Sequence, residues 1–297
     1  MNLLATDLSI LWPALIAGVL VAISHVPLGQ QVLSRGIVFI DLAIAQVAGL
    51  GVIAANSFGL PVEGWGPQAA AGAAALAGAL LLTWTERKRP EVQEALIGIL
   101  FVLASTAQIL LLANDPHGGE NLKELLAGQI LWVSNGQLIR TAVLTAIFSI
   151  VWFRWREQVG RAGFYVLFAV VVTASVQLVG VYLVFTTLIV PAVATYRHAS
   201  SRQLVLGYAL AFGSYLLGLA ASVVTDLPSS PVIVWAMAIL GLIVHLTATR
   251  SVLAEQKRVA VSCSPGDLAA RPRTSAHNGP AGHSPTPGSD SGAVSGK

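Results

Sequence analysis

Long stretches without a charged residue recur along this chain and limit what it can fold into. They cover residues 8–34, 64–85, 95–114, 141–153, 162–196, 203–225 and 227–249. Most of them are long enough to cross a hydrocarbon core of about 30 Å as a helix that rises about 1.5 Å per residue. Only 10% of all residues are charged, against about 25% in an ordinary soluble domain. The sequence therefore predicts an all-α, polytopic integral membrane protein.

Basic residues gather at alternate ends of these stretches. They are Arg35, the basic residues of 87–89, Arg154 and Arg161, Arg197 and Arg202, and Arg250 with the basic residues that follow it. Cytoplasmic loops carry an excess of Lys and Arg, so we place these ends in the cytoplasm. The alternation predicts helices near residues 8–26, 36–56, 67–85, 94–113, 137–153, 203–224 and 230–249.

Residues 162–196 do not fit this alternation, because they lie between two cytoplasmic basic clusters. A single helix of these 35 residues would be about 52 Å long, which is too long for one crossing. We expect two crossings, with helix breaks at Gly180, for its backbone freedom, and at Pro191, which removes a helical hydrogen bond. This gives about nine transmembrane helices, with eight as the alternative. Nine would put Met1 outside the cell and the C-terminal tail inside it.

The chain divides by composition into a transmembrane domain, residues 1–254, and a tail, residues 255–297. The tail is rich in Ser, Gly and Pro and cannot bury a core, so we expect a disordered cytoplasmic segment.

A single cysteine, Cys263, excludes an internal disulfide. The sequence contains no G-x-x-x-x-G-K-[ST] phosphate loop, so any ATP hydrolysis must belong to another chain. It also lacks the basic stripe with interleaved aromatic residues that is typical of nucleic-acid binding.

One carboxylate and one amide interrupt the apolar segment RGIVFIDLAIAQVAGLG, residues 35–51. A charged group inside the bilayer costs at least about 2.5 to 3.5 kcal/mol, so it tends to face the interior of a helix bundle and to have a function. We predict that Asp41 lines a translocation route and that Gln46 supports it as a metal-facing amide. The two lie about 140° apart around a helix, so two copies of Asp41 across a two-fold axis could flank one passage. The alternative is that each only hydrogen-bonds a neighbouring helix.

Several segments together resemble the metal-transport ABC permeases, the ABC-3 type membrane subunits of zinc, manganese and iron uptake. They are QLVGVYLVFTTLIVPAVAT at residues 177–195, TDLPSSPVIV at 225–234, AGQILWVS at 127–134 and ALIGIL at 95–100. The resemblance covers residues 30 to 250 in the order of the family. It implies the ABC importer permease fold and a homodimer in a bacterial inner membrane. It also implies cytoplasmic ATP-binding subunits and an extracytoplasmic metal-binding protein as partners.

The chain departs from the family in the segment that carries Asp41. The permeases place an acidic residue and a histidine four positions apart, on one helical face. Counted from Asp41, the histidine position is Ala45. If Gln46 is aligned with the histidine instead, Asp41 falls where a glycine is usual. One strong metal ligand is therefore missing from either alignment.

We interpret the chain as the permease subunit of an ATP-driven importer of a divalent cation, zinc or manganese, with no permanently bound cofactor. It is not expected to be an enzyme.

In such importers a cytoplasmic element must dock on the ATPase. The resemblance makes residues 194–202 the candidate, with Arg197, His198 and Arg202 in contact with the partner. A plain membrane anchor is the alternative for these residues. The alternative functions are a proton-coupled secondary cation transporter and a membrane scaffold without transport.

Overall fold

The regular structure of the described residues is entirely helical. The computed structural model describes residues 3–58, 65–113, 115–116, 118–128, 130–155, 158, 160–198 and 200–262. Its α-helices are α1 (Leu3–Arg35), α2 (Ile40–Ser57), α3 (Trp65–Lys88), α4 (Gln93–Leu112), α5 (Gly118–Ala127), α6 (Asn135–Trp155), α7 (Arg161–Val179), α8 (Val181–Thr195), α9 (Ser200–Thr225) and α10 (Ser229–Ser262). Two short 3-10 helices, η1 (Pro90–Val92) and η2 (Ile130–Trp132), lie in connections.

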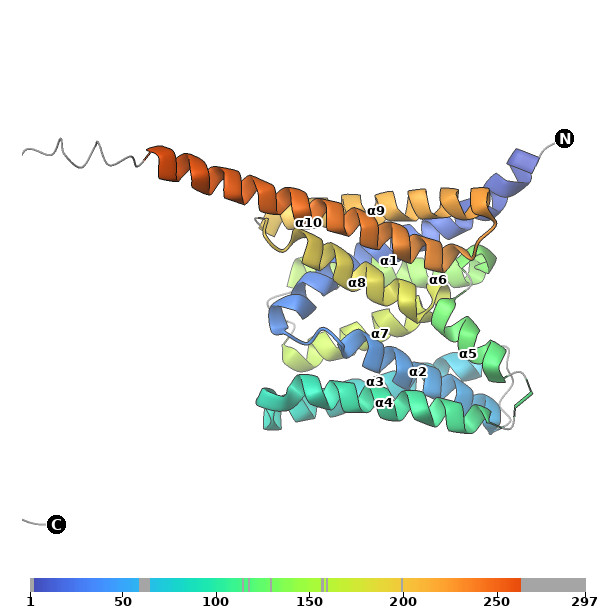
Figure 1. Cartoon of the computed structure of the whole chain (residues 1–297). Coiled ribbons are helices and arrows are strands. Elements are labelled where there is room, and N and C mark those ends of the chain that lie inside the picture. The colour runs from blue at the N-terminus through green and yellow to red at the C-terminus, as the bar shows by residue number, and fades with distance from the viewer. Residues whose placement is uncertain are drawn as a thin grey trace, which may run out of the picture. The chain divides into compact units, whose positions relative to one another are not determined.

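Eight helices in the described residues are long and apolar enough to cross a membrane, and α8 is a shorter apolar helix of the same kind. These eight are α1, α2, α3, α4, α6, α7, α9 and α10. With α8 counted between α7 and α9, successive apolar helices run in opposite directions through the bundle (Figure 1). We call the end of the bundle that carries Arg35, Lys88, Arg154 and Arg161 the basic end, since these residues close or begin their helices there. The predicted multi-pass helical fold is confirmed.

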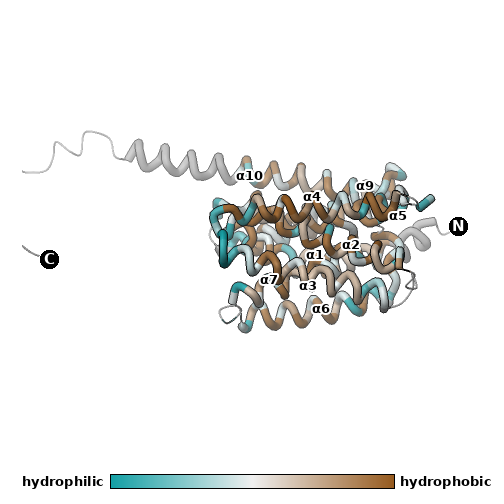
Figure 2. Tube along the Cα trace, turned by 90° about the horizontal axis from the view of Figure 1, so that it is seen from below, coloured by the Kyte–Doolittle hydropathy of each residue, from teal (hydrophilic) through white to brown (hydrophobic). Residues whose placement is uncertain are grey.

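Hydrophobic residues make up most of the length of the helices, and hydrophilic residues collect towards their ends (Figure 2). Many of the large hydrophobic side chains are exposed on the outside of the bundle. Helix α4 shows this most clearly, because Val102, Leu103 and Leu110 are all more than half exposed. Such a surface in water would be a large apolar patch. In a bilayer the same residues face lipid, which is the reason that a sequence with so few charges can fold.

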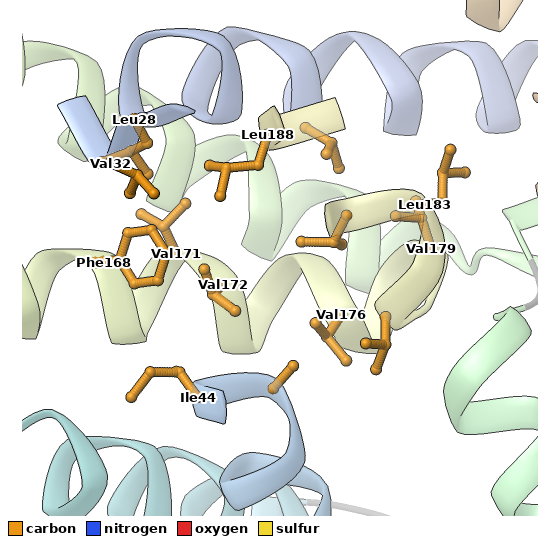
Figure 3. Close-up of a cluster of buried hydrophobic side chains, with 14 of the residues drawn as sticks. Leu28, Val32, Ile44, Phe168, Val171, Val172, Val176, Val179, Leu183 and Leu188 are labelled. Carbon is orange, nitrogen blue, oxygen red and sulfur yellow. The ribbon is translucent and has the colours of Figure 1, made fainter. Parts of the chain in front are cut away.

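The core of the bundle forms where α1, α7 and α8 meet, with α2 on the far side of α7. Leu28 and Val32 of α1, Phe168 and Val171 of α7, and Leu183 and Leu188 of α8 are buried in this layer (Figure 3). Helix α1 approaches α8 closely at Gly29, where a Cβ atom would overlap the backbone carbonyl of Leu188. Small residues allow such close helix contact in membranes, where association depends on van der Waals packing.

Residues 162–196 form two helices, as their length requires. Helix α7 ends at Val179 and α8 begins at Val181, so the chain turns at Gly180, whose φ is +85°. The break expected at Pro191 is wrong, because Pro191 lies inside α8, which continues to Thr195. Thr195 donates its hydroxyl to the carbonyl of Pro191 at 2.7 Å. The packing of neighbouring helices around α8, much of which is buried, makes a proline tolerable within it.

The predicted tail from residue 255 overlaps the end of α10. Helix α10 continues through Ser262, so residues 255–262 are helical. Residues 263–297 lie outside the described residues. Packing divides the chain into Met1–Val252 and Leu253–Lys297, close to the boundary expected at residue 254, and all that follows concerns the first unit.

Candidate functional site

Asp41 is a buried carboxylate with no hydrogen-bond partner. It lies in the first turn of α2 and is 1% exposed. Neither carboxylate oxygen has a hydrogen-bond donor in the described protein. The sequence suggested a position deep in a span, whereas the structure puts Asp41 near the start of its helix, where the helix dipole favours a negative charge. A buried acidic group without a partner is costly, so such a position usually has a function.

The face of α2 that carries Asp41 also lines a large cavity. Residues 41, 45, 48 and 52 are spaced by four, three and four positions, which places them on one stripe of the helix. Ala48 and Val52 border a cavity of about 850 Å³. Asp41 does not border it, because it lies farther along the stripe towards the start of α2. Ala45 lies between them and is completely buried, so the cavity is closed towards Asp41.

This cavity, which we call the outer cavity, lies between α2, α5 and α7, with the end of α4 and the start of α6 at its rim. Its polar lining comprises Asn56, Ser57, Asp115, Glu124, Gln137, Thr173 and Gln177. It is near the end of the bundle opposite the basic end, since Ser57 closes α2 and Gln137 is in the first turn of α6. Thr173 is 6% exposed, and its hydroxyl has no partner in the described protein. The lining of the outer cavity thus offers two carboxylates and several neutral side-chain oxygen atoms that could bind a cation.

Gln46 belongs to a different contact. The side-chain amide of Gln108 in α4 donates to the backbone carbonyl of Gln46 at 2.8 Å and to its Oε1 at 2.7 Å. Both glutamines are buried. The structure therefore does not bring Gln46 and Asp41 together, and the side-chain oxygen of Gln46 is engaged between α2 and α4.

Two glycines pack against each other where the outer cavity meets the break between α7 and α8. Gly128 follows α5 with φ of +69°, and Gly180 has φ of +85°. A Cβ atom on either residue would overlap the backbone at the other, so only glycine permits both the backbone angles and the close approach. Gly128 itself borders the outer cavity. The sequence of residues 118–127, an amphipathic helix between two spans, gives no sign of this role.

The segment that carries Arg197 and His198 is a turn between α8 and α9. The backbone N–H of His198 donates to the carbonyl of Thr195 at 2.9 Å, and the side chain of Gln203 donates to the carbonyl of Tyr196 at 2.9 Å. Arg197 and Arg202 are exposed, with Arg202 already in the first turn of α9. No separate short helix forms among the described residues of this turn. Its two arginines are available to a partner at the basic end.

Comparison with known proteins decides the family. The model of the ABC 3 transport family matches residues 7–160 and 156–248. The chain belongs to the ABC 3 transport family. Among solved structures, PsaBC from Streptococcus pneumoniae in complex with Fab matches with a TM-score of 0.66 and 21% sequence identity, over 82% of this chain and 95% of that chain. That likeness shows the shared fold.

Membership confirms the resemblance that the sequence motifs indicated. The permease is a non-catalytic membrane subunit of an ABC transporter, so ATP hydrolysis belongs to a partner subunit. The alternatives of a proton-coupled secondary transporter and of a scaffold without transport are thereby removed. Within the described part of the permease, no three His, Cys, Asp or Glu side chains lie close enough to hold a metal ion together.

Proposed function

We propose that this permease imports a divalent metal cation, zinc or manganese, across the plasma membrane of a bacterium. Two copies form the membrane path, an ATP-binding subunit docks at the basic end, and an extracytoplasmic metal-binding protein delivers the cation to the opposite end. The observation that carries the proposal is the shared stripe of α2. It joins the outer cavity at Ala48 and Val52 to the unpaired carboxylate of Asp41.

The outer cavity has the chemistry of a cation vestibule. Asp115 and Glu124 supply negative charge at its rim, and Thr173 and Gln177 supply oxygen atoms on the α7 wall. Oxygen donors of this kind suit divalent cations. Low dielectric walls strengthen the attraction, and a single carboxylate does not replace the whole hydration shell. Binding there is weak enough for the cation to move on.

Asp41 is the acidic group at the far end of the α2 stripe, beyond the outer cavity. Its carboxylate can attract a cation that has passed Ala45, and the absence of a second ligand nearby on α2 favours release over storage. Gln46 supports this role indirectly, because its bond with Gln108 holds α2 against α4. A second copy of the permease would place a second Asp41 at the passage.

The closed state seen here must open towards the basic end for import. Helix α8 connects the two places that matter, since it begins at Gly180 beside the outer cavity and ends at the turn with Arg197. Closure of the ATP-binding subunits against that turn would move α8 and with it the contact between Gly180 and Gly128. The cavity would then open towards Asp41.

Transport by the reconstituted complex tests the proposal. The permease is purified together with its ATP-binding subunit and placed in proteoliposomes with the metal-binding protein on the outer face. We expect ATP-dependent accumulation of manganese or zinc and none without ATP. A complex that assembles and hydrolyses ATP in response to the loaded binding protein, yet accumulates neither metal, would refute metal import.

A further inference from the structure

A second cavity lies at the basic end of the bundle and is not part of the proposed cation path. It has a volume of about 630 Å³ and lies between the end of α1, the end of α6 and the start of α9. We call it the basic-end pocket. Its lining includes Gln30, Ser34, Arg154, Trp155 and Gln203. None of these residues borders the outer cavity, so the two cavities need different explanations.

The side chains of the basic-end pocket suit an anion. Arg154 is the single charged residue of its described lining, and no carboxylate borders it there. Gln30 and Gln203 add amide groups that can donate hydrogen bonds, whereas the hydroxyl of Ser34 already donates to the carbonyl of Gln31 at 2.8 Å. A guanidinium with several neutral donors is the usual recognition set for a phosphate group.

One of these donors is ready for a ligand. The Nε2 atom of Gln30 is buried and has no hydrogen-bond partner in the described protein. A buried amide donor without an acceptor is destabilising, so an acceptor that enters the pocket gains a bond at little further desolvation cost. Gln203, on another wall, donates its own amide to the carbonyl of Tyr196 at 2.9 Å. Through this hydrogen bond, a residue that lines the pocket contacts the turn between α8 and α9.

The rim of the pocket distinguishes a lipid from a free phosphate. Phe153 and Trp155 flank Arg154 in α6 and are 62% and 45% exposed. Aromatic rings beside an arginine at the end of a membrane helix mark the level of the lipid headgroups. The cytoplasmic leaflet is rich in anionic lipids, and basic pockets between helices on that side bind their headgroups. A phosphate that carries acyl chains can fill the pocket and cover these rings at once.

We propose that the basic-end pocket binds the headgroup of an anionic phospholipid such as phosphatidylglycerol, with its phosphate on Arg154 and Gln30. The lipid then forms part of the wall beside the turn that carries Arg197. The proposal does not depend on which cation the permease transports. It also does not depend on Asp41 or the outer cavity.

Lipid titration of the purified permease, alone and with its ATP-binding subunit, tests the proposal. Native mass spectrometry counts bound short-chain phosphatidylglycerol against phosphatidylcholine of the same chain length. We expect phosphatidylglycerol to bind preferentially to both preparations, and Arg154→Gln to weaken it about five-fold, the usual contribution of one basic residue at an anionic surface. Gln30→Leu should weaken it as well. Arg161→Gln is the matched control, since Arg161 is exposed at the same end but does not border the pocket.

Four results would overturn the proposal. They are equal retention of phosphatidylcholine, unchanged binding by a folded Arg154→Gln variant, displacement of the lipid by inorganic phosphate at equal concentration, and loss of lipid binding when the ATP-binding subunit is present. The third would assign the pocket to free phosphate and the fourth to the subunit interface. Arg154 is exposed, so its replacement leaves the core intact, and gel filtration checks the fold of each variant.

Discussion

Single polar residues decide how this apolar bundle is held together and what it can transport. Asp41 is buried without a partner, whereas Gln46 has two hydrogen bonds from Gln108. A residue whose hydrogen bonds are satisfied by a neighbouring helix needs no ligand to explain it. A carboxylate without any partner does. This contrast assigns Gln46 to structure and leaves Asp41 as the candidate for function.

The contact between Gln46 and Gln108 should be measurable as stability. Gln108→Leu leaves the buried Oε1 of Gln46 without its donor, and we expect a loss of about 1 kcal/mol in detergent, in the range of hydrogen bonds between membrane helices. Thermal unfolding of the purified permease is the measurement. The double variant Gln46→Leu/Gln108→Leu should recover part of the loss, because no buried side-chain amide is then left unpaired. Strict additivity of the two single losses would argue against the contact.

Helix α8 and the glycines at its start form the element that links the two ends of the permease. Its 15 residues span about 22 Å, less than the hydrocarbon core. The start of α8 at Gly180 therefore lies within the depth of the membrane and not at its outer boundary. Irregular backbone at membrane depth requires cover by protein or a cavity, and Gly128 supplies that cover.

Gly180→Ala tests this contact. Alanine is strained at a φ of +85° and would overlap the backbone of Gly128, so we expect a destabilisation of at least about 1 to 3 kcal/mol in thermal unfolding. Gly98→Ala is the matched control, because a Cβ there meets no atom within 4 Å and alanine favours the helix. An unchanged melting temperature for Gly180→Ala would mean that α7 and α8 are not held at this point.

The turn at the other end of α8 should bind the ATP-binding subunit. Replacing Arg197 and Arg202 together by Glu reverses two exposed charges at the basic end, and we expect association to weaken at least about ten-fold through repulsion. Co-purification of the two subunits at graded salt concentrations measures it. Lys123→Glu is the control, since Lys123 is exposed on α5 near the outer cavity. Unchanged association of the double variant would leave the arginines as membrane anchors.

At the scale of the whole molecule, most of the fold could be predicted from the order in which apolar segments and clusters of charged residues follow one another along the sequence. Each predicted helix appears, because a run of apolar residues in a bilayer has no stable alternative to a helix. The first and the last are longer than predicted, since α1 continues to Arg35 and α10 to Ser262. The turn at Gly180 could also be predicted, since glycine alone adopts its backbone angles without strain.

The positions that could not be predicted depend on contacts between distant segments. Pro191 does not break α8, because α8 is buried among neighbouring helices, whose packing keeps it helical where the proline lacks an N–H. The sequence 118–127 reads as an amphipathic connector, and only its contact with α7 and α8 makes it a wall of the outer cavity. A signal existed in the glycine at 128, but its partner lies 52 positions away at Gly180.

The path of the chain through residues 161–195 predicts which side each connection faces. In a Cys263→Ser background, single cysteines at Gln158 and Arg197 should react with a membrane-impermeant maleimide only from the cytoplasm, because α7 and α8 run in opposite directions between them. A cysteine at Asp226, after α9, should react only from outside. Labelling of the Gln158 and Arg197 positions from opposite sides would mean that α7 and α8 make one crossing together.

The most direct test of the account is metal uptake by Asp41→Asn. The variant keeps the size of the side chain and removes its charge, so a carboxylate that attracts the passing cation is lost while the helix remains. In proteoliposomes with the ATP-binding subunit and the loaded binding protein, we expect uptake of manganese or zinc to fall at least about ten-fold. Assembly of the complex, measured by co-purification, should be unchanged. Uptake at the wild-type rate would show that Asp41 is structural and contradict the proposed path.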